Sequence, residues 1–162
     1  MRTLRNSRFG PALRALVALT SIASLTGCLS LDVEQPSDAP SDPASETFAP
    51  SLGVDISTMQ RTPSGVYYKN GPLGAGKAVS GLGTVIVSYI GYLKNGAIFQ
   101  QGDNVQIVLA NEIVGLQEGL QGMLEGGERL LVIPSALAFG SSTGAVPPNS
   151  TVVYDIVVHS VP

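Results

Sequence analysis

Few residues of this 162-residue chain have the types and spacing that polar catalysis requires. The chain has one histidine, His159, and one cysteine, Cys28. A Ser-His-Asp hydrolase would have to use His159, which the sequence places on the outward side of the last apolar strand, close to the C-terminus. A zinc site would need carboxylates alone, because no second histidine or cysteine is present. The sequence therefore predicts neither hydrolase chemistry nor a metal or other cofactor.

One segment has the spacing of a nucleotide-binding loop. GPLGAGK, residues 71–77, matches the first seven positions of a phosphate-binding P-loop. The next residue is Ala78, where a Ser or Thr hydroxyl would hold magnesium, and the segment is neither preceded by an apolar strand nor followed by a helical pattern. We interpret it as a turn-rich connector and predict no nucleotide binding.

The N-terminus has the layout of a secretory signal peptide. Residues 1–14 contain four arginines, and an apolar run follows from about residue 15 to residue 25, too short to span a bilayer. Leu25-Thr26-Gly27-Cys28 then resembles the lipobox of bacterial lipoproteins. This predicts a signal peptide over residues 1–27 and an acylated Cys28 as the lipid anchor. The alternative is an ordinary signal peptide with an incidental cysteine.

The anchor would place the mature protein in the bacterial envelope. Leu29 follows the cysteine where some inner-membrane lipoproteins have aspartate, which favours the outer membrane. Residues 28–52 are rich in Pro, Ser and Asp, and we predict a disordered tether there. After Cys28 the chain has five basic and twelve acidic residues, a net charge of −7, so nucleic acid is not expected as a partner.

Residues 53–162 have the length and pattern of one domain. Apolar residues alternate in several short segments, including 84–93, 105–109 and 151–161, as in antiparallel strands with one covered face. In residues 114–128 apolar residues instead follow a helical spacing, and Gly126-Gly127 marks a helix end. The predicted fold class is therefore α+β, a curved antiparallel sheet wrapped around one short amphipathic helix. A monomer is the expected state.

Three segments of this domain resemble the FKBP-type peptidyl-prolyl isomerases. They are VSYIGYLKNGAIF (87–99), IVGLQEGLQGMLEGGERLLVIPSALAFG (113–140) and VPPNSTVVYDIVV (146–158), which occur in the order typical of that family. The resemblance implies an FKBP-like sheet around a helix, an apolar pocket for a proline ring, and rotation about X-Pro peptide bonds without a cofactor. It also implies proline-containing polypeptides as partners.

The resemblance also assigns roles to individual residues. It places five residues at the catalytic positions of the pocket: Tyr89, Phe99, Gln100, Phe139 and Tyr154. It places four more at substrate-binding positions: Val105, Ile113, Leu116 and Val146. Without the resemblance, an inward-facing Tyr or Phe on a sheet is more often simple core packing.

Three of these positions depart from the usual residues of the family. Gln100 stands where an aspartate is common, Leu116 where a tryptophan is common, and Phe139 where a tyrosine is common. Two hypotheses follow. One is an isomerase acting on exported proteins, which the intact aromatic set and motif order favour. The other is a peptide-binding or chaperone module of the same fold with little turnover, which the three substitutions favour.

Overall fold

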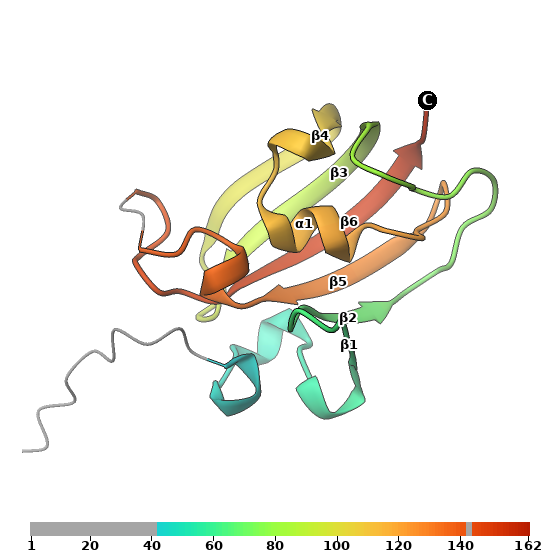
Figure 1. The fold of residues 1–162 in the computed structure, drawn as a ribbon. Coiled ribbons are helices and arrows are strands. Elements are labelled where there is room, and N and C mark those ends of the chain that lie inside the picture. The colour runs from blue at the N-terminus through green and yellow to red at the C-terminus, as the bar shows by residue number, and fades with distance from the viewer. Residues whose placement is uncertain (1–41, 142–143) are drawn as a thin grey trace, which may run out of the picture. The chain divides into compact units, whose positions relative to one another are not determined.

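The computed structural model describes residues 42–141 and 144–162 (Figure 1). The predicted signal peptide, Cys28 and most of the predicted tether lie outside these residues. The strands are β1 (Gln60–Arg61), β2 (Tyr67–Asn70), β3 (Thr84–Leu93), β4 (Ile98–Val108), β5 (Glu128–Ile133) and β6 (Val152–Ser160), and the α-helix is α1 (Val114–Gly119). Short 3-10 helices are η1 (Pro43–Ser45), η2 (Pro50–Leu52), η3 (Ile56–Thr58), η4 (Leu109–Asn111) and η5 (Ser135–Leu137).

The strands form one six-stranded sheet in the order β1-β2-β5-β6-β3-β4. Every neighbouring pair is antiparallel. Helix α1 lies across one face of the curved sheet, as Figure 1 shows. This is the predicted architecture of a sheet wrapped around one helix. Within the described residues, no helix has both the length and the apolar character needed to cross a bilayer.

The alternation predicted for the last strand is confirmed. Val152, Tyr154, Ile156 and Val158 belong to the hydrophobic cluster on the α1 face and are almost fully buried. Asp155 and His159 are exposed, whereas Val153, which shares their face, is fully buried in a second cluster. The side chains of β6 therefore build two cores, one on each face of the sheet.

Helix α1 packs unusually close to β5 because it carries two glycines one turn apart. A Cβ atom at Gly115 would lie 2.1 Å from Cγ2 of Ile133, and one at Gly119 would lie 2.7 Å from Cδ1 of Leu131. Any larger residue would push the helix away from the sheet. These glycines therefore set the depth of the core between α1 and β5.

The helix is shorter than the sequence pattern predicts. It ends at Gly119, and residues 120–127 form turns in which Gly122 and Gly126 have positive φ angles of 73° and 79°. The left-handed backbone at Gly122 turns the chain out of the helical path, and the buried Arg129 guanidinium of β5 donates from Nη1 to the carbonyls of Gly119 (2.5 Å) and Gln121 (3.2 Å). These bonds satisfy carbonyls that a further helical turn would otherwise use.

The folded region begins earlier than the sequence predicts. Residues 43–52, assigned above to a disordered tether, form η1 and η2, and Phe48 and Leu52 pack against Val132 and Val153 on the sheet face opposite α1. The prolines of this segment start short helical turns, at Pro43 and Pro50, because proline is well suited to the first position of a helix. This segment has the composition of a linker but forms short helical turns that pack on the sheet.

Candidate functional site

A pocket of about 220 Å³ opens on the α1 face, between the start of β4 and the loop that follows η5. Six residues line it: Phe99, Gln100, Phe139, Gly144, Ala145 and Val146. Four of them are among the residues assigned to the site from the sequence. None of the six carries an ionisable side chain, so the pocket offers an apolar environment with one neutral amide.

Two of the lining residues, Phe99 and Phe139, belong to a cluster of aromatic rings. Phe99 is central: its ring centroid lies 5.6 Å from that of Phe139 and 5.7 Å from that of Tyr154, both in edge-to-face geometry at 88°. Tyr89 extends the group, with its centroid 6.0 Å from that of Tyr154. Edge-to-face pairs of this kind restrict each other's rotation and contribute about 0.5–1.5 kcal/mol each beyond buried area. The structure thus brings together all four aromatic residues that the sequence assigned to catalysis.

Gly91 makes this ring cluster possible, although it is not among the site residues predicted from the sequence. It lies in β3, paired with Gln100 of β4 on one side and with Tyr154 of β6 on the other. A Cβ atom at Gly91 would lie 2.8 Å from Cζ of Phe99 and 3.1 Å from Cε1 of Tyr154. A glycine inside an otherwise apolar strand was the available signal, since it often marks a close approach.

Gln100 interacts with the tyrosine on the neighbouring strand. Its Nε2 donates a hydrogen bond to Oη of Tyr89 over 2.8 Å. Because the phenol oxygen accepts this bond, the phenol proton stays available for another acceptor. An aspartate at this position would instead accept that proton. The glutamine therefore leaves Tyr89 as a hydrogen-bond donor next to Gln100, which lines the pocket.

Tyr154 lies behind Phe99 and is only 1% exposed. Burial raises the pKa of its phenol well above the usual value, and the nearby Tyr89 and Glu112 raise the pKa further. Each of these causes disfavours the negatively charged phenolate. Tyr154 therefore stays neutral at any physiological pH.

The remaining predicted residues belong to the same hydrophobic cluster but do not line the pocket. Leu116 of α1 is 3% exposed, and Val105 and Ile113 are partly buried. Among the backbone hydrogen bonds of the described loops, none is donated by the Ile113 amide, whose residue stands just before α1. Ile113 thus has a backbone donor to offer a ligand, whereas Leu116 acts from within the core.

The loop carrying Val146 is closed by backbone hydrogen bonds. The Gly140 amide donates to the Ser135 carbonyl over 2.8 Å, and the Asn149 amide donates to the Gly140 carbonyl over 2.7 Å. Val146 itself is only 5% exposed, so its side chain packs inward toward Phe99 and Phe139. Val146 therefore forms one wall of the pocket.

A larger hollow of about 580 Å³ lies on the other face of the sheet, and polar residues border it. Here Oγ of Ser88 donates to Oδ1 of Asp103 over 2.7 Å, lies 2.6 Å from Nε2 of His159, and accepts from the Asn104 amide over 2.9 Å. A serine nucleophile would have to give its proton to the histidine, not to the carboxylate. This cluster is arranged the wrong way for hydrolysis, and Ser88 and Asp103 line this hollow and not the aromatic pocket.

Comparison with known proteins identifies the class that this fold and pocket define. Residues 75–159, just over half of the chain, match the family model of the FKBP-type peptidyl-prolyl cis-trans isomerases. The chain therefore belongs to the FKBP-type peptidyl-prolyl cis-trans isomerase family, as its three sequence segments indicated.

Individual relatives agree with this assignment. The chain is 36% identical over 115 residues to the peptidyl-prolyl cis-trans isomerase Mip of Chlamydia pneumoniae, covering 68% of this chain and 44% of that protein. It is 36% identical over 116 residues to FkpA of Escherichia coli, covering 68% and 41%. The chain thus spans less than half the length of these curated relatives.

A solved structure confirms the fold. The crystal structure of a peptidyl-prolyl cis-trans isomerase from Pseudomonas syringae matches with a TM-score of 0.60 and 28% identity, over 63% of this chain and 79% of that one. The predicted FKBP-like class, an antiparallel sheet with a short helix, is therefore correct for the described residues.

Proposed function

We propose that this protein catalyses cis-trans isomerisation of X-Pro peptide bonds, with the proline ring bound in the pocket between Phe99, Phe139 and Val146. The observation that carries the proposal is the interlocked group of rings beside an open apolar pocket, in a chain of the isomerase family. Rotation about the bond needs no nucleophile or cofactor, because its barrier of about 18–20 kcal/mol arises from amide resonance alone.

The chemistry follows from the neutral character of this pocket. Water stabilises a planar amide more than a twisted one, because amide resonance separates charge. Transfer into an apolar pocket therefore favours the twisted transition state over the planar ground state. The phenol of Tyr89 and the amide of Ile113 supply donors for the peptide carbonyls, so that binding energy is directed to the twisted geometry.

The substrates we propose are exported polypeptides, and the site of action is the bacterial envelope. Support comes from the N-terminal sequence alone, in which Cys28 follows a lipobox-like segment. X-Pro isomerisation takes tens to hundreds of seconds and limits folding of chains with native cis prolines. A catalyst held by acyl chains on a membrane surface, with the outer membrane favoured by Leu29, would meet these chains soon after export.

An isomerisation assay on the full-length chain tests the activity directly. The substrate is an Ala-Ala-Pro-Phe peptide, and the variants are Phe99→Ala and Phe99→Leu, each checked by thermal unfolding. Loss of the central ring should lower kcat/KM by about 100-fold in Phe99→Ala and less in Phe99→Leu. His159→Ala, on the opposite face, is the matched control and should retain full activity. A wild-type rate no faster than that in buffer would overturn the proposal.

The second candidate is a proline-binding module with little turnover. The observation that favours it is the polar content of the pocket, which is limited to the Gln100 amide and lacks a hydroxyl at Phe139. Peptide affinity that depends on Phe99, without turnover, would establish this alternative. Gln100→Asp adds a further comparison. If this substitution raises a measurable wild-type isomerisation rate, the neutral amide of Gln100 adjusts the rate of an active enzyme and is not a sign of lost activity.

The lipid anchor is tested separately. We expect Cys28→Ser to release the protein from the membrane fraction, because no other residue of the lipobox-like segment can accept acyl chains. Retention of the Cys28→Ser protein on membranes would contradict the anchor while leaving the isomerase proposal unaffected.

A further inference from the structure

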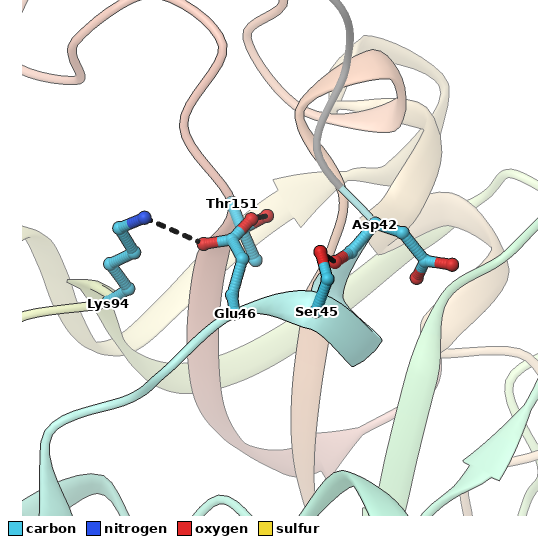
Figure 2. Close-up of polar contacts among 5 residues, drawn as sticks. All are labelled: Asp42, Ser45, Glu46, Lys94 and Thr151. Carbon is cyan, nitrogen blue, oxygen red and sulfur yellow. Dashed lines mark hydrogen bonds and ion pairs between the residues drawn. The ribbon is translucent and has the colours of Figure 1, made fainter. Parts of the chain in front are cut away.

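The first described residues form a capped turn that presents one carboxylate to the rest of the domain (Figure 2). Oδ1 of Asp42 accepts from the Ala44 amide over 3.1 Å, and the Asp42 carbonyl accepts from Oγ of Ser45 over 2.8 Å. Pro43, the first residue of η1, is buried. This turn fixes the direction of the chain as it enters Glu46.

The carboxylate of Glu46 is nearly removed from solvent, with its side chain 6% exposed. Its Oε1 accepts a hydrogen bond from Oγ1 of Thr151 over 2.6 Å, and its Oε2 lies 3.1 Å from Nζ of Lys94 (Figure 2). Thr151 is fully buried, whereas the Lys94 side chain is 56% exposed. A buried carboxylate is costly unless it is paired and hydrogen-bonded, so these contacts restrict where Glu46 can lie.

Thr151 and Lys94 belong to the two chain segments that carry the pocket walls. Thr151 ends the loop that bears Val146 and directly precedes β6. Lys94 lies in the turn between β3 and β4, just before the segment that bears Phe99, and its carbonyl also accepts from the Ala49 amide over 2.8 Å. One carboxylate from the N-terminal segment therefore joins both segments at their bases.

We infer that Glu46 is a positioning residue for the proline pocket, acting through Thr151 on the loop that carries Val146 and through Lys94 on the turn that leads to Phe99. An apolar residue in place of Glu46 would bury the same surface without linking the two segments. The Glu46 carboxylate does more than fill space. Its two oxygens contact Thr151 and Lys94 and so restrict the distance between the loop that carries Val146 and the turn that leads to Phe99. This inference rests on the proposed function of the pocket, and its test separates the two.

The test compares Glu46→Ala with Glu46→Gln and Thr151→Val in the full-length chain, with the same Ala-Ala-Pro-Phe peptide. Glu46→Ala should lower kcat/KM by about tenfold, mainly through KM, since a displaced Val146 wall weakens ground state and transition state alike. Glu46→Gln keeps an acceptor for Thr151 and should recover most of the loss. In the double variant Glu46→Ala/Thr151→Val, the Thr151→Val substitution should cost less than it does in the wild type, because the hydrogen bond between Glu46 and Thr151 is already lost.

Leu52→Ala is the matched control, because it removes a buried contact of the same N-terminal segment on the far face of the sheet. It should lower thermal stability and leave KM unchanged. If Glu46→Ala lowers stability as Leu52→Ala does and also leaves KM unchanged, Glu46 is only structural and the inference is wrong. Additive effects of Glu46→Ala and Thr151→Val would also contradict it.

A wild-type protein without turnover would overturn the proposed function but not end this test. The affinity of the same peptide, measured by titration, then replaces KM. Under the inference, Glu46→Ala weakens that affinity by about tenfold and Glu46→Gln restores it. Equal affinities of the wild type and Glu46→Ala would overturn the inference whatever the outcome for turnover.

Discussion

The two faces of the sheet differ in what covers them and in what they leave open. On the α1 face, aromatic rings close against one another and leave a small pocket lined by neutral side chains. On the opposite face, the N-terminal segment covers Val132 and Val153, and beside it lies a hollow bordered by Asp103, Glu128 and Asp155. These three carboxylates lie where water solvates them, and the neutral pocket lies where an amide can be desolvated.

This contrast supports the proposal that the chemistry uses the aromatic pocket and not the polar cluster on the other face. The bonds of Ser88 orient a surface network but leave no group prepared to attack a substrate. The side chains that line the pocket of Phe99 and Phe139 carry no charge, and under the proposed function they change the medium around a bound amide. Substitutions that remove only buried contacts on the far face should therefore affect stability without activity, and those in the pocket should affect activity.

The largest expected effect lies on the face away from the pocket. Leu52→Ala removes a buried side chain that packs with Tyr67, Val132 and Val153, and should lower the free energy of unfolding by about 2–3 kcal/mol. Urea unfolding measures this loss, and kcat/KM measured well below the melting temperature should not change. A stability change below about 0.5 kcal/mol would mean that the N-terminal segment does not cover this face in solution.

The N-terminal segment also shows where prediction from sequence reaches its limit. The alternation of β6 predicted which residues face α1, because a period of two is a local property of a strand. It could not predict that Val153 on the other side is buried as well, since its cover comes from Phe48 and Leu52. Those residues lie among prolines, serines and acidic residues, a composition that is shared by disordered linkers and by capped turns.

The second expected effect lies in the pocket itself. Gly91→Ala places a methyl group against the rings of Phe99 and Tyr154 and should displace the Phe99 ring, with a loss in kcat/KM of about tenfold, or 1.4 kcal/mol. The matched control is Gly83→Ala, because a Cβ atom at Gly83 meets no atom within 4 Å. Equal activities of the two variants would show that the ring cluster tolerates the methyl group and that Gly91 is not required.

The pocket could be predicted from the sequence in its residues but not in its contacts. Phe99, Phe139 and Tyr154 were found through motifs that keep their order along the chain. The bond from Gln100 to Tyr89 depends on the register of β3 against β4, which shifts between Val87 and Tyr89 and again between Gly91 and Tyr92. Such shifts depend on packing between strands distant in sequence, and no local pattern encodes them.

The smallest expected effect concerns the buried phenol behind the pocket. Burial raises the pKa of Tyr154 in the folded protein above the value of about 10 expected in the unfolded chain. Below pH 10 the phenol is neutral in both states and contributes no pH dependence. Above pH 10 the unfolded chain loses this proton while the folded protein keeps it, so stability falls as the pH rises.

Tyr154→Phe removes this ionisation and nearly preserves the ring contacts, so it isolates the effect. Between pH 8 and pH 11 the wild type should lose about 1 kcal/mol more free energy of unfolding than Tyr154→Phe, as measured by urea unfolding. The lysines and exposed tyrosines titrate in both proteins, and their contribution cancels in the comparison. An identical pH dependence would mean that Tyr154 ionises as easily in the folded protein as in the unfolded chain. The ring behind Phe99 would then be open to water, and the desolvated pocket on which the proposed isomerisation depends would not exist.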